Sequence, residues 1–99
     1  MWKKLVRDDI AEVIREHGGN PDTYEADDCE YAARLRDKLT EEVCEYLSGG
    51  ELEELADILE VAYALAGLRG VDPAHLEQLR AGKAARYGTF TRHLILVQD

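Results

Sequence analysis

The chain has 99 residues, the length of a single domain, and 45% of them are apolar. Its formal net charge is −9 and its pI is near 4.7. This charge argues against duplex nucleic acid and anionic membranes as partners, because both need a basic protein surface. There is no run of 18 apolar residues, and no apolar segment follows the N-terminal lysines. Neither membrane insertion nor export is therefore predicted.

The two cysteines, Cys29 and Cys44, do not form a CxxC pair. They are too few for a zinc site or a disulfide framework. Free thiols in a reducing compartment are the plain interpretation, so we expect a cytoplasmic protein.

The first half of the chain is predicted to hold two helices. The first covers about residues 9–17, where apolar residues recur at helical spacing after an Asp9-x-x-Glu12 start. The glycine- and proline-containing segment 18–21 ends it. The second helix is predicted to begin at Asp27 or Asp28 and to reach about Leu47.

The second half is predicted to hold two more helices and a strand. The third helix covers about residues 51–68, and the fourth opens on Asp72-Pro73, an N-cap followed by proline at the first helical position, and ends near Gly88. The β-branched and aliphatic residues 90–97 predict a strand, with its partner in residues 2–6. We therefore expect one all-α domain over residues 1–99, a bundle of about four helices that a short two-stranded pairing of the termini could close.

An uncompensated acidic segment is the most informative feature of the chain. Between Leu39 and Leu68 there are eight acidic residues and no lysine or arginine. Carboxylates this close together repel one another, so they favour either full solvation or a bound cation. Five of them follow the pattern E-E-x-x-E and E-x-x-D on either side of a short Ser-Gly-Gly break: Glu41, Glu42, Glu45, Glu54 and Asp57.

The third helix is apolar on two sides. One stripe is formed by Leu52, Leu55, Leu59, Ala62 and Ala66, and the other by Ile58, Val61, Leu65 and Leu68. A helix of this kind lies inside a bundle or between subunits, so we expect a homo-oligomer, either a dimer or a tetramer. Continued toward the N-terminus, the second stripe runs into Asp57 and Glu54, which places these two acids in line with core positions.

The spacing of the acids predicts that they converge. Residues three apart share a helix face, and a loop of about three residues makes the second and third helices antiparallel. Glu45 then comes level with Glu54, and Glu42 with Asp57. Carboxylates without a suitably placed histidine favour magnesium or manganese over iron. The alternative is a solvated acidic helix face.

The fourth helix is expected to add phosphate-binding cations. If it returns antiparallel to the third, Lys83 comes level with Ile58 and Arg86 with Leu55. A divalent ion flanked by lysine and arginine suits polyphosphate chemistry. The alternative is that both residues only complement the C-terminal end of their own helix.

These motifs resemble those of the all-α nucleoside triphosphate pyrophosphohydrolases, the superfamily of MazG, dimeric dUTPases and phosphoribosyl-ATP pyrophosphohydrolase. The likeness is closest to a house-cleaning, MazG-like branch, and it covers nearly the whole chain. Beside the acidic motif it includes the segments 4–14 and 53–65 and the closing K-x-x-R-x-G-x-F at residues 83–90. Asp9 stands where the branch usually has lysine, and Ala11 where it usually has proline.

The resemblance implies a role for each motif. Glu42, Glu45, Glu54 and Asp57 would hold Mg²⁺, or Mn²⁺ in its place, and Glu41 would orient or deprotonate the attacking water. Phosphates would be bound by Lys83 and Arg86, with Arg7 in the same pocket. The implied reaction hydrolyses the α–β phosphoanhydride of a nucleotide and gives the monophosphate and pyrophosphate.

Three classes of function remain open at the level of sequence. The leading one is a Mg²⁺-dependent nucleotide pyrophosphohydrolase, with the substrate unspecified. The second is a catalytically weak metal- and nucleotide-binding regulatory module on the same fold. The third is a purely structural acidic oligomer.

Overall fold

The computed structural model describes residues 3–98, which form four α-helices and no β-strand. The helices are α1 (Ile10–Glu16), α2 (Asp28–Gly49), α3 (Leu52–Gly67) and α4 (Pro73–Tyr87). The all-α class is confirmed, and each helix boundary lies within about two residues of its expected position.

Side-chain caps and a left-handed glycine set the limits of the long helices. The Asp27 carboxylate accepts the Glu30 backbone N–H at 2.8 Å, and the Asp72 carboxylate accepts that of His75 at 2.8 Å. The α2 helix is capped by Gly50, whose φ of 70° suits glycine and whose N–H donates to the Tyr46 carbonyl at 2.7 Å. The chain reverses there within two residues, so α3 returns alongside α2.

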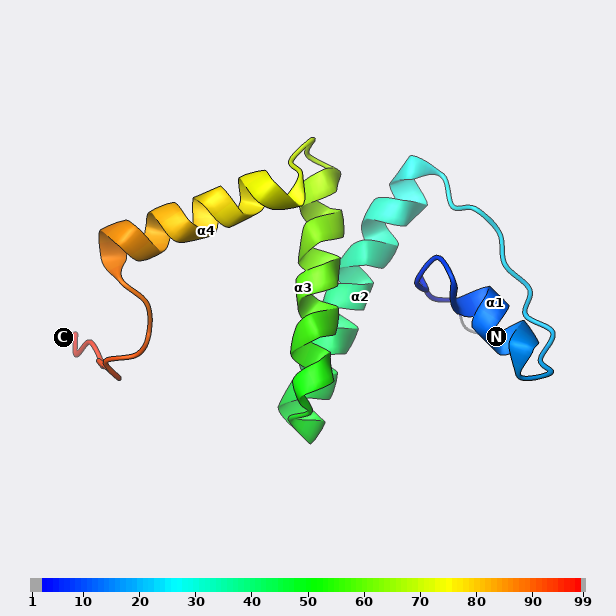
Figure 1. The fold of residues 1–99 in the computed structure, drawn as a ribbon, viewed down its shortest axis with the longest axis horizontal. Helices are drawn as coiled ribbons and strands as arrows, with labels where there is room; N and C mark the ends of the chain where they lie inside the picture. The colour runs from blue at the N-terminus through cyan, green and yellow to red at the C-terminus, as the bar shows by residue number, and fades with distance from the viewer. Residues whose placement is uncertain (1–2, 99) are drawn as a thin grey trace.

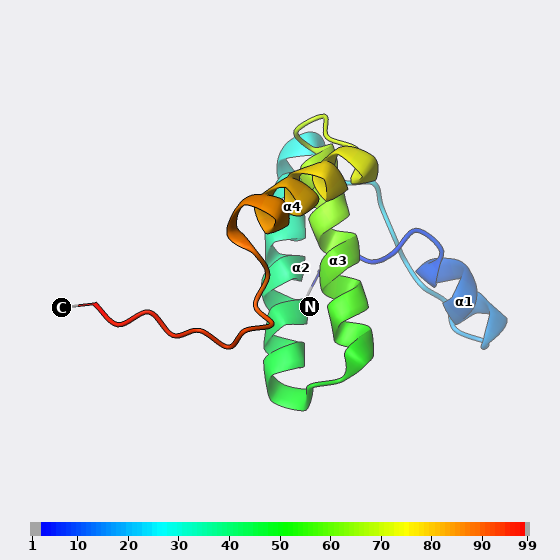
Figure 2. The same ribbon diagram turned by 60° about the vertical axis from the view of Figure 1, so that its left-hand side comes forward.

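The antiparallel α2–α3 hairpin is the centre of the molecule (Figures 1 and 2). Its small apolar core contains Leu35 and Val61, the two apolar residues buried among those described. The stripe of α3 that contains Val61 is therefore the one turned inward. The other stripe stays open: Leu52, Leu55 and Leu59 are all exposed. The helix that the sequence makes apolar on two sides buries only one of them in the single chain.

The α4 helix does not fold back along α3. Gly70, with φ of 73°, turns the chain, and the Val71 N–H donates to the Ala66 carbonyl at 3.1 Å. From this turn α4 projects away from the hairpin at a wide angle (Figure 1). The expected antiparallel return of the fourth helix is therefore wrong.

The chain after Gly88 has no regular structure through Gln98. The strand expected at residues 90–97 is therefore wrong. Residues of high β propensity form a strand only when another strand satisfies their backbone groups, and this segment lies apart from the described N-terminal residues (Figures 1 and 2). Trp2, in the expected partner segment, lies outside the described residues.

The resulting shape is extended. The radius of gyration is 17.3 Å, against roughly 13 Å for a compact domain of this length. None of the helices among the described residues combines the length and the apolar content that a membrane span needs.

Candidate metal and phosphate site

Five carboxylates meet where α2 and α3 pass each other. Their oxygens form two groups, in each of which the atoms lie within 4.8 Å of one another. One group is formed by Glu41, Glu42 and Glu45, and the other by Glu42, Glu54 and Asp57. The structure thus brings together all five acids that the sequence singled out, and Glu42 belongs to both groups.

Glu42 is the buried member of this cluster, with only 5% of its surface exposed. Its Oε1 lies 3.3 Å from the Lys38 ammonium, whereas its Oε2 is buried without a hydrogen-bond partner in the protein. Glu54 Oε2 is also buried without a hydrogen-bond partner in the protein. Buried carboxylate oxygens are costly unless a donor or a cation satisfies them. Two such oxygens in one cluster fit a hard divalent cation, which prefers oxygen ligands.

The charge of the cluster also raises the pKa of one member. Desolvation raises the pKa of Glu54 to about 7, together with hydrogen-bonding proximity to Glu45 and Glu42 and their negative charge. At neutral pH this carboxyl therefore lies between its protonated and ionised forms. A proton and a metal ion satisfy the same requirement here, because either one relieves the repulsion among the three glutamates.

Two lysines neutralise the outer side of the cluster. Lys38 lies 3.3 Å from Glu41 Oε2, and Lys4, from the N-terminal segment, lies 3.0 Å from Glu41 Oε1. The hydrogen bond from Lys4 and the charge of Lys38 lower the pKa of Glu41. Glu41 is therefore ionised at neutral pH.

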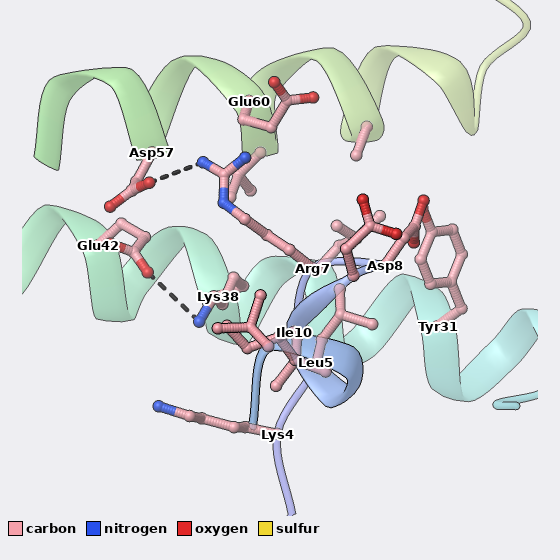
Figure 3. Close-up of a pocket in the computed structure, with 16 residues that line it drawn as sticks. Lys4, Leu5, Arg7, Asp8, Ile10, Tyr31, Lys38, Glu42, Asp57 and Glu60 are labelled. Atoms are coloured by element: carbon pink, nitrogen blue, oxygen red, sulfur yellow. Dashed lines mark hydrogen bonds and ion pairs between the residues drawn. The ribbon is translucent and has the colours of Figure 1, made fainter. Parts of the chain in front are cut away.

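Arg7 reaches across the hairpin to the opposite side of the cluster, where its guanidinium donates to Asp57 Oδ1 at 2.7 Å (Figure 3). The segment that carries Arg7 is anchored upstream by Arg34, which donates to the Lys3 carbonyl at 3.0 Å. Between this segment and the hairpin lies an open pocket of about 780 Å³. Its walls combine acidic, basic and apolar side chains, among them Lys4, Arg7, Tyr31, Leu35, Lys38, Glu42, Asp57 and Glu60.

Lys83 and Arg86 do not reach this pocket. Both are exposed on α4, and neither lines the pocket around Glu42 and Asp57. The Arg86 guanidinium instead lies 5.1 Å from the centre of the neighbouring Tyr87 ring. Within one chain, the carboxylates and the cations of the fourth helix are therefore separate.

Sequence reasoning missed Lys38 and Lys4 as parts of the site. Lys38 lies three and four residues before Glu41 and Glu42, so the helical spacing alone could have found it. Lys4 belongs to the N-terminal motif, but its contact with Glu41 spans 37 residues and has no local signal. Asp9, which stands where the related branch has lysine, does line the pocket.

Comparisons of the chain with protein-family models, with curated proteins and with solved structures gave no match. The similarity to the pyrophosphohydrolases therefore rests on the motif residues themselves.

Proposed function

We propose that the chain is a Mg²⁺-dependent nucleotide pyrophosphohydrolase. It would hydrolyse the α–β phosphoanhydride of a nucleoside triphosphate or related nucleotide, and release the monophosphate and pyrophosphate. The observation that carries the proposal is the buried Glu42, shared by two carboxylate groups and left with one unsatisfied oxygen. A solvated acidic face would not bury this carboxylate.

The donor set suits Mg²⁺, with Mn²⁺ as a substitute, because it contains carboxylate oxygens only. Glu42, Glu45, Glu54 and Asp57 are the residues that would hold the ion. When bound, such an ion makes a coordinated water more acidic and neutralises charge on phosphate oxygens. Glu41 is adjacent, ionised and held in place by two lysines, so it would orient the attacking water.

The phosphate chain would enter the pocket beside the N-terminal segment. Arg7 and Lys38 line it, and both are cations that can donate to phosphate oxygens. A pocket of about 780 Å³ is in the size range of small-molecule sites, and Tyr31 and Leu35 give it an apolar wall. Arg7 contacts Asp57, which would also hold the divalent cation, so cation binding would release Arg7 toward the phosphates.

We further propose that this activity serves cytoplasmic house-cleaning of the nucleotide pool, as in the branch that the motifs resemble. The substrate would be one of the triphosphates that such enzymes remove, or phosphoribosyl-ATP.

The test is pyrophosphate release from a panel of ordinary, deoxy, oxidised and deaminated triphosphates and phosphoribosyl-ATP, with and without Mg²⁺. Glu45→Ala should abolish release, whereas Glu53→Ala should keep it, because Glu53 is exposed on the same hairpin and belongs to neither carboxylate group. Release that survives Glu45→Ala would refute the site. Silence of the whole panel while Mg²⁺ raises the melting temperature would instead favour the regulatory binding module.

A further inference from the structure

One side of α2 forms a continuous wall of the pocket beside the N-terminal segment. Tyr31, Leu35, Lys38 and Glu42 all line this pocket, and their spacing of four, three and four residues places them on one face of the helix. At the α-helical rise per residue, the row from Tyr31 to Glu42 extends over about 16 Å. The pocket therefore has room for a nucleoside as well as for a chain of phosphates.

The two ends of the pocket differ in chemistry (Figure 3). Glu42 and Asp57 lie at one end, which we call the carboxylate end, and the cations that would bind phosphate lie beside them. The opposite end, which we call the tyrosine end, contains the ring of Tyr31 and the side chain of Asp8. A ligand that fills the pocket therefore meets charged groups of both signs at one end, and an aromatic ring with a carboxylate at the other.

Asp8 and the Tyr31 hydroxyl are both free to contact a ligand. The neighbouring Arg7 turns to Asp57 at 2.7 Å, and within residues 3–98 neither the Asp8 carboxylate nor the Tyr31 hydroxyl takes part in a hydrogen bond or an ion pair. The Tyr31 side chain is half-buried and Asp8 is exposed. An ionised carboxylate accepts hydrogen bonds and donates none. The tyrosine end thus offers a flat ring beside a pure acceptor.

The phosphates decide which way a nucleotide lies in this pocket. They belong with the cations at the carboxylate end, so the base of the same nucleotide points along α2 toward the tyrosine end. This orientation rests on the proposed function. A base that stacks on Tyr31 gains binding energy whatever its identity, because every base has an aromatic face. Selection among bases then depends on the polar group at the edge of the base, which is Asp8.

We propose that the pocket selects guanine nucleotides, with the base stacked on Tyr31 and its edge bound by Asp8. Guanine presents two adjacent N–H donors, N1–H and the 2-amino group, which match the two oxygens of one carboxylate. Adenine and cytosine present an amino group beside a ring-nitrogen acceptor, and uracil presents one N–H between two carbonyls. Each of these three bases therefore sets a lone pair against a carboxylate oxygen.

The oxidised base 8-oxoguanine keeps both donors, so Asp8 does not separate it from guanine. Within the proposed function, the pocket therefore favours triphosphates of guanine and of 8-oxoguanine over phosphoribosyl-ATP, whose base is adenine.

Binding of α,β-methylene triphosphates in Mg²⁺ buffer, measured by calorimetry, tests the proposal without turnover. We expect the guanosine analogue to bind at least about tenfold more tightly than the adenosine, cytidine and uridine analogues. This is the lower end of the range for a charge-assisted hydrogen bond, because Asp8 is exposed. The inosine analogue, which lacks the 2-amino group, should lie between guanosine and adenosine.

Asp8→Asn should shift the preference toward adenine. An amide offers one acceptor and one donor, which match the amino group and the ring nitrogen of adenine. We expect the ratio of guanosine to adenosine affinity to fall at least about tenfold. Loss of a merely structural contact would instead weaken all the analogues together.

Two controls remove the same charge from other walls of the pocket. Asp9→Asn and Glu60→Gln should change the affinities of all the analogues alike and leave their order intact. Tyr31→Leu should weaken all of them by a similar factor, roughly tenfold, because stacking does not depend on the identity of the base.

Equal affinity for the four bases, or an Asp8→Asn variant that keeps the wild-type ratio, would overturn the proposal. A change of order in Asp9→Asn and not in Asp8→Asn would overturn the role of Asp8. Guanine-selective binding without pyrophosphate release from any triphosphate would count against the proposed function alone. Release from all triphosphates at equal efficiency would leave that function standing and overturn the selection of guanine. No binding of any analogue would overturn both.

Discussion

Replacement of Arg7 by alanine should change cation binding and nucleotide binding in opposite directions. Arg7 donates to Asp57 at 2.7 Å, and the two side chains are 57% and 36% exposed. Exposed ion pairs of this kind contribute about 0.2–1 kcal/mol. Removing a competitor of that strength from Asp57 should tighten Mg²⁺ binding by at most about fivefold. The melting temperature without metal should fall by no more than a few degrees, roughly 4–8 °C per kcal/mol.

The nucleotide should respond much more strongly. If Arg7 binds a phosphate, its loss removes a charge-assisted hydrogen bond of about 1.5–3 kcal/mol, which weakens nucleotide binding roughly 10- to 150-fold. Mn²⁺ binding, followed by electron paramagnetic resonance, gives the first quantity, and the KM for pyrophosphate release gives the second. Arg36→Ala is the matched control, since it removes an exposed arginine of α2 that does not line the pocket.

Two results would contradict these roles of Arg7. A weaker Mn²⁺ affinity in Arg7→Ala would mean that Arg7 supports the cation and does not compete with it. An unchanged KM would mean that the N-terminal segment does not touch the phosphates. The negative charge of Asp9, which lines the pocket, would repel phosphates and so favour that outcome.

Four further predictions follow, two on pH, one on the core and one on Lys38. Because the pKa of Glu54 is raised to about 7, Mg²⁺ affinity in calorimetric titrations should fall up to about tenfold per pH unit below 7, and Glu54→Gln should flatten this dependence. Because of the same raised pKa, the metal-free folded state binds more protons than the unfolded state between pH 4.5 and 7. The free energy of unfolding, measured in urea, should therefore decrease as the pH rises through this window. Glu54→Gln should remove the decrease. Leu35→Ala should lower the free energy of unfolding by about 2–5 kcal/mol, because Leu35 is 2% exposed and belongs to a small core; a loss below about 1 kcal/mol would contradict the α2–α3 packing. Lys38→Met should destabilise the metal-free protein by about 1–3 kcal/mol, since it removes the ammonium that pairs with the buried Glu42 Oε1. Saturating Mg²⁺ should restore most of this loss in thermal unfolding, and a loss that Mg²⁺ does not offset would contradict the shared role of the cations.

The helices and the convergence of the acids follow from local signals in the sequence. Asp27 and the Asp72-Pro73 pair are caps, and Gly50 forces a reversal, so the boundaries need no tertiary information. The short reversal brings together residues equidistant from it, which is why the spacing of Glu42 and Asp57 predicts their proximity.

The features that depend on distant contacts could not be predicted in the same way. The direction of α4 depends on the turn at Gly70, and the spacing of apolar residues in the helices does not predict the φ angle of this glycine. The β propensity of residues 90–97 predicts a strand, but propensity does not show whether a partner strand is present to pair with it. The placement of Arg7 on Asp57 joins residues 50 positions apart. The two-sided apolar pattern of α3, in contrast, correctly marks a face that the single chain leaves uncovered.

The most direct test of the account is Mn²⁺ binding to Glu42→Gln beside Glu53→Gln. The two variants remove the same charge from the same hairpin, but only Glu42 is buried in the cluster and shared by both carboxylate groups. We expect Glu53→Gln to bind Mn²⁺ as the wild type does, and Glu42→Gln to lose affinity by more than about tenfold. Equal binding by both variants, or no binding by the wild type, would contradict a cation site built around Glu42.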